Sequence, residues 1–167
     1  MPYPTHRIDL VVLSVEPEFC IPETALRDLQ RTWEAAGLVV GDRAGDDASG
    51  LVADGFARLW LDQPARMMLY ANQQGGFRVT CPGNGENIAA EFGAALVRWR
   101  AGAPRSVRCP ACGEVHPLEG CVLAPPGAFA SSAIVFSDVG GVTLTRRARA
   151  DLKAAIGAFV VVVRRTL

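Results

Sequence analysis

The stretch that decides the fold of this chain is residues 109–121, which read CPACGEVHPLEGC. The spacing C-x2-C-x3-H-x4-C makes Cys109, Cys112, His116 and Cys121 a set of three thiolates and one imidazole. Such a set fills a closed tetrahedral Zn²⁺ shell and leaves no position for a substrate. We therefore predict a structural zinc ion held by these four side chains, rather than a catalytic metal.

The same segment resembles the CCHC zinc knuckle of retroviral nucleocapsid proteins, in which a glycine follows the second cysteine as Gly113 follows Cys112. It also resembles one CPxCG half of a zinc ribbon. The spacing before His116 is one residue shorter than in the retroviral knuckle. The positions by which such knuckles stack on and neutralise nucleic acid are held here by Pro110, Ala111, Glu114 and Glu119. The resemblance implies zinc binding and disfavours nucleic-acid recognition by this segment.

The whole chain is similar to a group of short bacterial proteins of unknown function that carry a central CPxCG. That resemblance implies a stand-alone cytoplasmic domain. It implies nothing about a substrate.

Other readings of the cysteines stay open. Cys81 could replace either His116 or Cys121 as the fourth ligand, and all five cysteines could be reduced thiols without a metal. Cys-Pro-Ala-Cys also resembles the glutaredoxin type of C-x-x-C. The glycines and the proline that follow Cys112 disfavour the long helix that this redox chemistry uses.

Two further functions compete with a non-enzymatic binding or adaptor module. The first is a small cysteine-dependent enzyme with Cys81 as nucleophile, activated at the entry to a helix, and His116 as base. The second is a domain that binds RNA or another polyanion, because residues 1–96 hold 7 basic and 13 acidic side chains (net −6) and residues 97–167 hold 10 and 4 (net +6). The basic side chains of that surface would be Arg98, Arg100, Arg105, Arg108 and those of the helix that begins near Thr145.

Length and composition predict one domain over residues 1–167, with 103–126 as a metal-stabilised connecting loop. The chain has 167 residues, half of them apolar and a fifth charged, which is an ordinary globular balance. An odd number of cysteines without an export signal indicates a reducing cytoplasm. The longest apolar run, 155–163, is too short to span a bilayer, so we expect no membrane partner. An unknown protein partner and a homo-oligomer both remain open.

Hydrophobic periodicity predicts an α+β fold with three helices against a mixed, largely antiparallel sheet. The helices should run from Pro22 to Gly37, from an N-cap at Asn84 to Gly102, and from a cap at Thr145 to Gly157. No internal repeat is apparent. The expected strands are 8–15, 38–40, a meander of 56–62, 67–71 and 76–81 with a turn at 72–75, a hairpin of 132–137 with 142–144, and 159–163.

Overall fold

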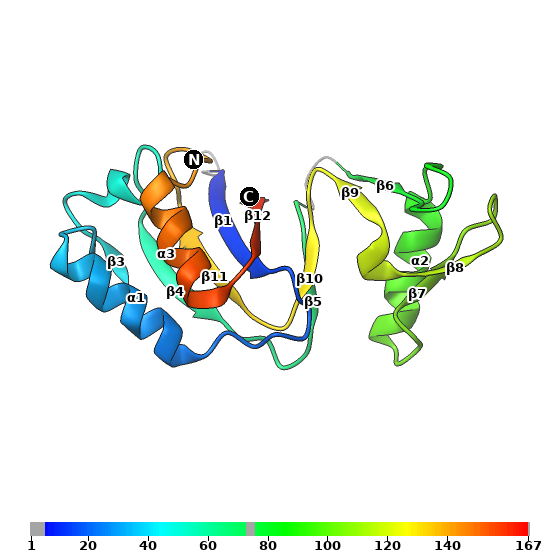
Figure 1. The fold of residues 1–167 in the computed structure, drawn as a ribbon. Helices are drawn as coiled ribbons and strands as arrows, with labels where there is room; N and C mark the ends of the chain where they lie inside the picture. The colour runs from blue at the N-terminus through cyan, green and yellow to red at the C-terminus, as the bar shows by residue number, and fades with distance from the viewer. Residues whose placement is uncertain (1–5, 73–75, 167) are drawn as a thin grey trace, which may run out of the picture.

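The computed structural model describes residues 6–72 and 76–166, which form helices and short strands in two lobes (Figure 1). The helices are α1 (Glu23–Ala35), α2 (Ala89–Arg100) and α3 (Arg146–Ile156), with single 3-10 turns at Ala48–Gly50 and Leu118–Gly120. The strands are β1 (Arg7–Ser14), β2 (Val39–Val40), β3 (Arg43–Ala44), β4 (Arg58–Asp62), β5 (Met68–Tyr70), β6 (Arg78–Thr80), β7 (Ser106–Arg108), β8 (Val115–Pro117), β9 (Val122–Ala124), β10 (Ala128–Ala130), β11 (Ala133–Ser137) and β12 (Phe159–Thr166).

The first lobe is a six-stranded sheet of order β12-β1-β11-β4-β3-β2, and α1 and α3 cover one of its faces (Figure 1). Alternate residues of β1 point to that face because side chains alternate along a strand. Leu10 and Val12 are therefore buried against the helices, together with Trp33 of α1 and Phe136 of β11. Every strand pairing in the described residues is antiparallel, and the α+β class is confirmed.

The opposite face of this sheet packs on a two-stranded ribbon made by β5 and β10. Tyr70 pairs with Ala128 and Met68 pairs with Ala130 in the antiparallel register of the ribbon. The side chains of Tyr70 and Ala130 join Val11 and Val135 in a small buried cluster on this face. The chain leaves the first lobe through β5 and returns to it through β10.

The second lobe consists of residues 76–124, which lie between β5 and β10 in the sequence. It contains α2 and two short strand pairs, β6 with β9 and β7 with β8 (Figure 1). Its core is separate from that of the first lobe and includes Ile88, Phe92, Val107 and Leu118. The segment 103–126, predicted as a connecting loop, thus contributes three strands to this lobe.

Two local strand predictions are wrong. The predicted meander is split among three sheets, because β4 pairs with β3 and β11, β5 pairs with β10, and β6 pairs with β9. The predicted hairpin does not form either: β11 lies between β1 and β4, and Leu144 makes only an isolated bridge to Val52. In both cases the partner strands come from distant parts of the sequence, which local periodicity cannot identify.

The helix predictions fare better. Thr145 caps α3 by accepting a hydrogen bond from the Ala148 N–H at 3.1 Å, and Gly157 ends it with a φ of 78°, as expected from the sequence. The second helix begins at Ala89 rather than at Asn84, because residues 81–88 form a hairpin turn instead. The turn predicted at 72–75 falls mostly outside the described residues.

Candidate metal centre

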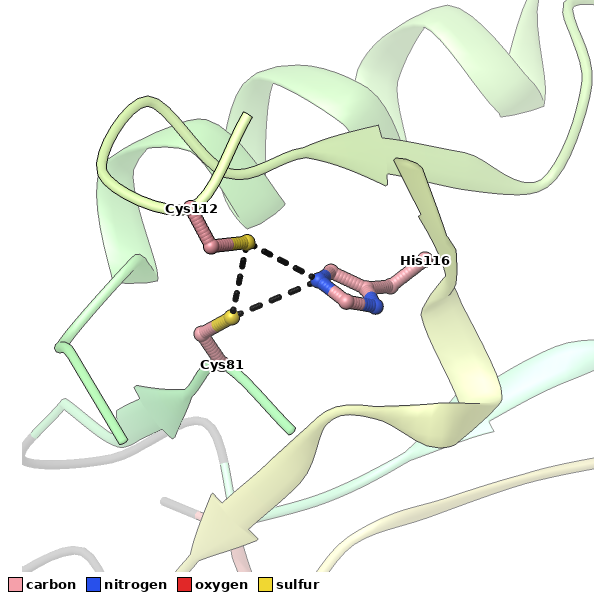
Figure 2. Close-up of side chains that lie close together, drawn as sticks. All are labelled: Cys81, Cys112 and His116. Atoms are coloured by element: carbon pink, nitrogen blue, oxygen red, sulfur yellow. Dashed lines mark hydrogen bonds between the residues drawn. The ribbon is translucent and has the colours of Figure 1, made fainter. Parts of the chain in front are cut away.

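Three donor side chains meet in the second lobe between the ends of its two strand pairs. Cys81 follows β6, Cys112 lies in the turn after β7, and His116 lies on β8. The Sγ atoms of Cys81 and Cys112 are 3.7 Å apart, and each is 3.4 Å from Nε2 of His116. Figure 2 shows the three side chains directed toward one point. Because their donor atoms lie within 4.8 Å of one another, the group could hold a metal ion.

Cys109 lies beside these three side chains and is the candidate for a fourth donor. Its thiol is fully buried, accepts a hydrogen bond from the Cys112 N–H at 3.5 Å, and interacts with the thiols of Cys81 and Cys112. The resulting set of three thiols and one imidazole joins residues that are up to 35 positions apart in the sequence. A metal at this point would therefore link the turn after β6 to the β7–β8 hairpin.

The backbone of the turn influences the two cysteines of residues 109–112 in opposite directions. The N–H of Cys112 lowers the pKa of Cys109 below that of an ordinary thiol, and this outweighs burial. For Cys112, the N–H of Glu114 lowers the pKa. Burial and the adjacent thiols of Cys109 and Cys81 outweigh it, so the pKa of Cys112 is raised. Once one of these neighbouring thiols is ionised, its negative charge disfavours ionisation of the other unless a cation compensates for the charge.

The predicted ligand Cys121 lies outside this group. Its Sγ is directed to the carbonyl oxygen of Pro117 at 3.8 Å, and its side chain belongs to the apolar core of the lobe. Burial raises the pKa of this thiol to about 11, which keeps it protonated at neutral pH. The turn Leu118–Gly120 explains the placement, because Leu118 takes the fully buried position and Cys121 starts the run into β9. Of the four residues predicted from the sequence, the structure brings together Cys109, Cys112 and His116, and Cys81 joins them in place of Cys121.

The turns that carry the donors are two copies of one sequence pattern. Residues 81–86 read CPGNGE and residues 109–114 read CPACGE, so both follow C-P-x-x-G-E at a separation of 28 positions. The prediction of no internal repeat is therefore wrong. The sequence left Cys81 open as a replacement for Cys121, and this pattern is the signal that favours Cys81 as the partner of Cys109.

Both copies, which we call knuckles, have the same backbone hydrogen bonds. The first residue of each donates its N–H to the glutamate carbonyl, at 2.8 Å for Cys81 and 3.0 Å for Cys109. The glycine donates its N–H back to the carbonyl of that cysteine, at 3.0 and 2.9 Å, with φ of 75° at Gly85 and 74° at Gly113. A positive φ favours glycine at both places. A backbone N–H also reaches each first thiol, because Gly83 donates to Cys81 at 3.4 Å as Cys112 does to Cys109.

The strands that flank the two knuckles correspond as well. Thr80 bridges to Asn87 across the first knuckle, as Arg108 pairs with Val115 across the second. One step further out, Ile88 donates its N–H to Val79, and His116 pairs with Val107. His116 thus occupies in its hairpin the place that Ile88 occupies in the other.

The four arginines of the predicted polyanion surface are not equivalent. Arg105 is bound by the carboxylates of Glu18 and Glu119, at 2.8 and 3.0 Å. Arg108 donates to the carbonyl of Gly113 at 2.7 Å and so supports the second knuckle. Arg98 and Arg100 are exposed near the end of α2. Of the four arginines, these two are accessible to an anion.

Comparison of the chain with known protein families, with curated proteins and with solved structures gives no match. In the part of the chain that the structure describes, no helix has the length and apolar character needed to cross a membrane.

Proposed function

We propose that this protein is a non-enzymatic, cytoplasmic binding module whose second lobe is held together by a structural zinc ion. The ligands are Cys81, Cys109, Cys112 and His116. This assignment keeps the chemistry predicted for residues 109–121 and exchanges Cys121 for Cys81. All five cysteines are free of disulfide bonds, in line with a reducing compartment.

The observation that carries the proposal is the spacing of the donor atoms. Tetrahedral zinc, with bonds of about 2.3 Å to sulfur and about 2.0 Å to nitrogen, places two sulfurs about 3.8 Å apart and sulfur and nitrogen about 3.5 Å apart. The distances here are 3.7 Å between the Cys81 and Cys112 sulfurs and 3.4 Å from each sulfur to His116. A disulfide would need sulfurs about 2.05 Å apart.

The donor set also supports a structural role. Cys81, Cys109 and His116 are buried and Cys112 is partly exposed, so most of the centre is shielded from solvent. Three thiolates and one imidazole complete the tetrahedral shell, whereas catalytic zinc sites keep one position for water or substrate. The second lobe has fewer than about 50 residues and strands of three residues each. A core of that size is marginal by itself, and a bound metal adds its binding free energy to folding.

A groove at the junction of the lobes supports the binding role. It has a volume of about 630 Å³ and lies where the link before β5 meets the end of α2. Met67, Met68 and Trp99 supply its apolar wall. Arg66 and Arg100 stand on it without a salt bridge to any acidic group in the described residues. We name this the Met–Trp groove; its lining residues are Pro64, Ala65, Arg66, Met67, Met68, Trp99, Arg100 and Arg105.

The chemistry of the Met–Trp groove fits an apolar body that carries an anionic group. Methionine and tryptophan side chains adapt to apolar surfaces, and a guanidinium binds a carboxylate or phosphate. An acidic residue next to a hydrophobic one on a partner protein would supply both features. Arg105 is less available than its neighbours, because Glu18 and Glu119 already bind it.

The experiment that tests the metal centre compares two cysteine variants. Untagged wild type should contain one zinc per chain by elemental analysis. Cys81→Ser should lose most of it, because the shell then lacks a ligand, whereas Cys121→Ser should keep it. Loss of zinc in Cys121→Ser and retention in Cys81→Ser would instead support the ligand set read from residues 109–121 alone.

A second candidate function has one specific observation in its favour. Cys81 Sγ lies 3.4 Å from His116 Nε2, the arrangement of a cysteine nucleophile and its base. The two readings differ in thiol reactivity. In the metal centre, iodoacetamide should modify Cys81 only after a chelator is added. In a cysteine-dependent enzyme, Cys81 should react first and without a chelator.

A further inference from the structure

The first knuckle lacks one donor that the second knuckle has. In the pattern C-P-x-x-G-E the fourth position is Cys112 in the second knuckle and Asn84 in the first. The second knuckle therefore offers two thiols, Cys109 and Cys112, whereas the first offers only Cys81. The missing donor position is Asn84.

The backbone hydrogen bonds place Asn84 and Cys112 at the same position of their turns. The Oδ1 atom of Asn84 accepts the N–H of Glu86 at 3.1 Å. The N–H of Glu114, two residues after Cys112 in the second knuckle, lowers the pKa of the Cys112 thiol from the corresponding place. Because the backbone bonds of the knuckles also correspond, Asn84 stands in its turn as Cys112 does in the other.

The first knuckle also lies directly against the donors. A Cβ atom at Gly83 would be 3.4 Å from Cε1 of His116 and 3.6 Å from Sγ of Cys112. A side chain at position 83, next to Asn84, would therefore be in van der Waals contact with both ligands.

His116 supplies the donor that the first knuckle does not. It comes from the strand after the second knuckle, at the place that Ile88 holds in the first hairpin. Ile88 has no atom that can bind a metal, and it packs in the core. The symmetry of the two hairpins is thus broken at two positions: Asn84 lacks a thiol, and His116 has an imidazole where its counterpart is apolar.

We propose that Asn84 holds the place of a fourth thiolate and that His116 is the ligand that substitutes for it. This inference rests on the proposed metal centre and extends it: the site is a two-knuckle centre of three thiolates and one imidazole, which one substitution converts to a centre of four thiolates. Asn84→Cys supplies the missing thiolate, and His116 is then no longer needed for binding.

The test uses Co²⁺ as a spectroscopic substitute for zinc in the full chain. His116→Ala should weaken Co²⁺ binding at least about a hundredfold, as expected when a closed shell loses one ligand. The double variant His116→Ala with Asn84→Cys should restore it. Its sulfur-to-cobalt charge-transfer absorbance should exceed that of wild type by about a third, since four thiolates replace three.

A matched control keeps the number of cysteines constant. Glu86 lies in the same turn and is exposed, but its position corresponds to Glu114 and not to a donor. His116→Ala with Glu86→Cys should therefore not regain Co²⁺ binding. Equal recovery in both double variants, or recovery in neither, would overturn the assignment of Asn84.

Metal binding by wild type, by Asn84→Cys and by the double variant separates this inference from the proposed function. If wild type binds no metal and Asn84→Cys binds Co²⁺, the proposed function and the substitution by His116 both fail, and only the assignment of Asn84 stands. If wild type binds metal and Asn84→Cys with His116→Ala does not, the assignment fails and the centre of three thiolates and one imidazole stands. If neither wild type nor Asn84→Cys binds metal, both are wrong.

Discussion

Arg105 of the second lobe donates to Glu18 of the first, with Nη2 2.8 Å from Oε1. The same guanidinium is held by Glu119 and lies over the ring of Trp99, 5.9 Å from its centroid. Arg105 is therefore a link between the loop after β1 and the core of the second lobe.

We predict that Arg105→Gln lowers the free energy of unfolding by about 1 kcal/mol at neutral pH, because a partly buried bidentate pair is lost.

The effect of this substitution should depend on pH. The hydrogen bond from Arg105 outweighs burial and holds the pKa of Glu119 below its usual value. A depressed carboxyl pKa contributes stability above the ordinary pKa of the group, and this contribution is lost as the pH falls through the depressed value. Urea unfolding at neutral pH and at about pH 3 should therefore show a difference between wild type and variant that shrinks in acid. Arg98→Gln serves as the control, and an equal effect there would contradict the role of Arg105.

A second prediction concerns Asp9, which is fully buried on β1. Its carboxylate receives Arg7 Nε at 2.9 Å, Arg164 Nη2 at 3.1 Å and the Asp138 N–H at 3.2 Å. Burial raises its pKa, but these hydrogen bonds outweigh burial and hold the pKa below that of a free aspartate. Asp9→Asn should cost about 3 kcal/mol at neutral pH, because it removes the buried carboxylate that pairs with the guanidinium groups of Arg7 and Arg164. The cost should decline in acid, as the pH falls through the depressed pKa.

Chemical denaturation of Asp9→Asn beside Asp42→Asn checks this. Asp42 also pairs with an arginine, Arg58, but both side chains are about half exposed. We expect Asp42→Asn to change the unfolding free energy by less than about 0.5 kcal/mol. Equal losses in the two variants would show that burial of Asp9 does not matter.

Removal of the metal should loosen the second lobe before the sheet of the first lobe. In the proposed metal centre, chelation removes the ion that joins the two knuckles through Cys81, Cys109, Cys112 and His116, whereas the core around β1, β11 and α3 lies in the other lobe. Hydrogen exchange followed by mass spectrometry should show faster exchange in 76–124 and little change in β1, β11 and β12. Uniform loss of protection across both lobes would contradict separate cores.

The Met–Trp groove can be probed with 8-anilinonaphthalene-1-sulfonate, an aromatic anion. Metal-loaded wild type should enhance its fluorescence, and Arg100→Glu should weaken binding about tenfold, since one charge-assisted contact is replaced by repulsion. Met68→Glu, at a side chain that is 43% exposed, should do the same through the apolar wall. Arg98→Glu lies outside the lining residues and should leave binding unchanged; equal weakening there would indicate a general charge effect.

The sequence carries the local features of this fold better than the pairing of its strands. The stripe of α1 that includes Trp33 and the cap at Thr145 follow from neighbours three or four positions away, so the helices could be predicted. The partner of β5 is β10, which lies about 60 residues later, and nothing in the pattern around Met68 identifies it.

The candidate site likewise combines ligands that are close in sequence with one that is distant. Cys109, Cys112 and His116 lie within eight residues and could be grouped from their spacing. Cys81 is 28 residues before Cys109, and only the repeated C-P-x-x-G-E pattern connects the two. Cys121 follows at a plausible ligand spacing, but the buried Leu118 and its turn direct the chain away from the other donors.

The β5–β10 ribbon makes the chain modular. Tyr70 and Ala128 are direct partners across it, so the polypeptide enters and leaves the second lobe at neighbouring points. The approach is close, because a Cβ at Gly127 would lie 2.9 Å from Cβ of Ala71. A two-residue turn between these partners would remove all four candidate ligands and join β5 directly to β10. In such a shortened protein, the turn between β5 and β10 would be a site at which another domain could be inserted.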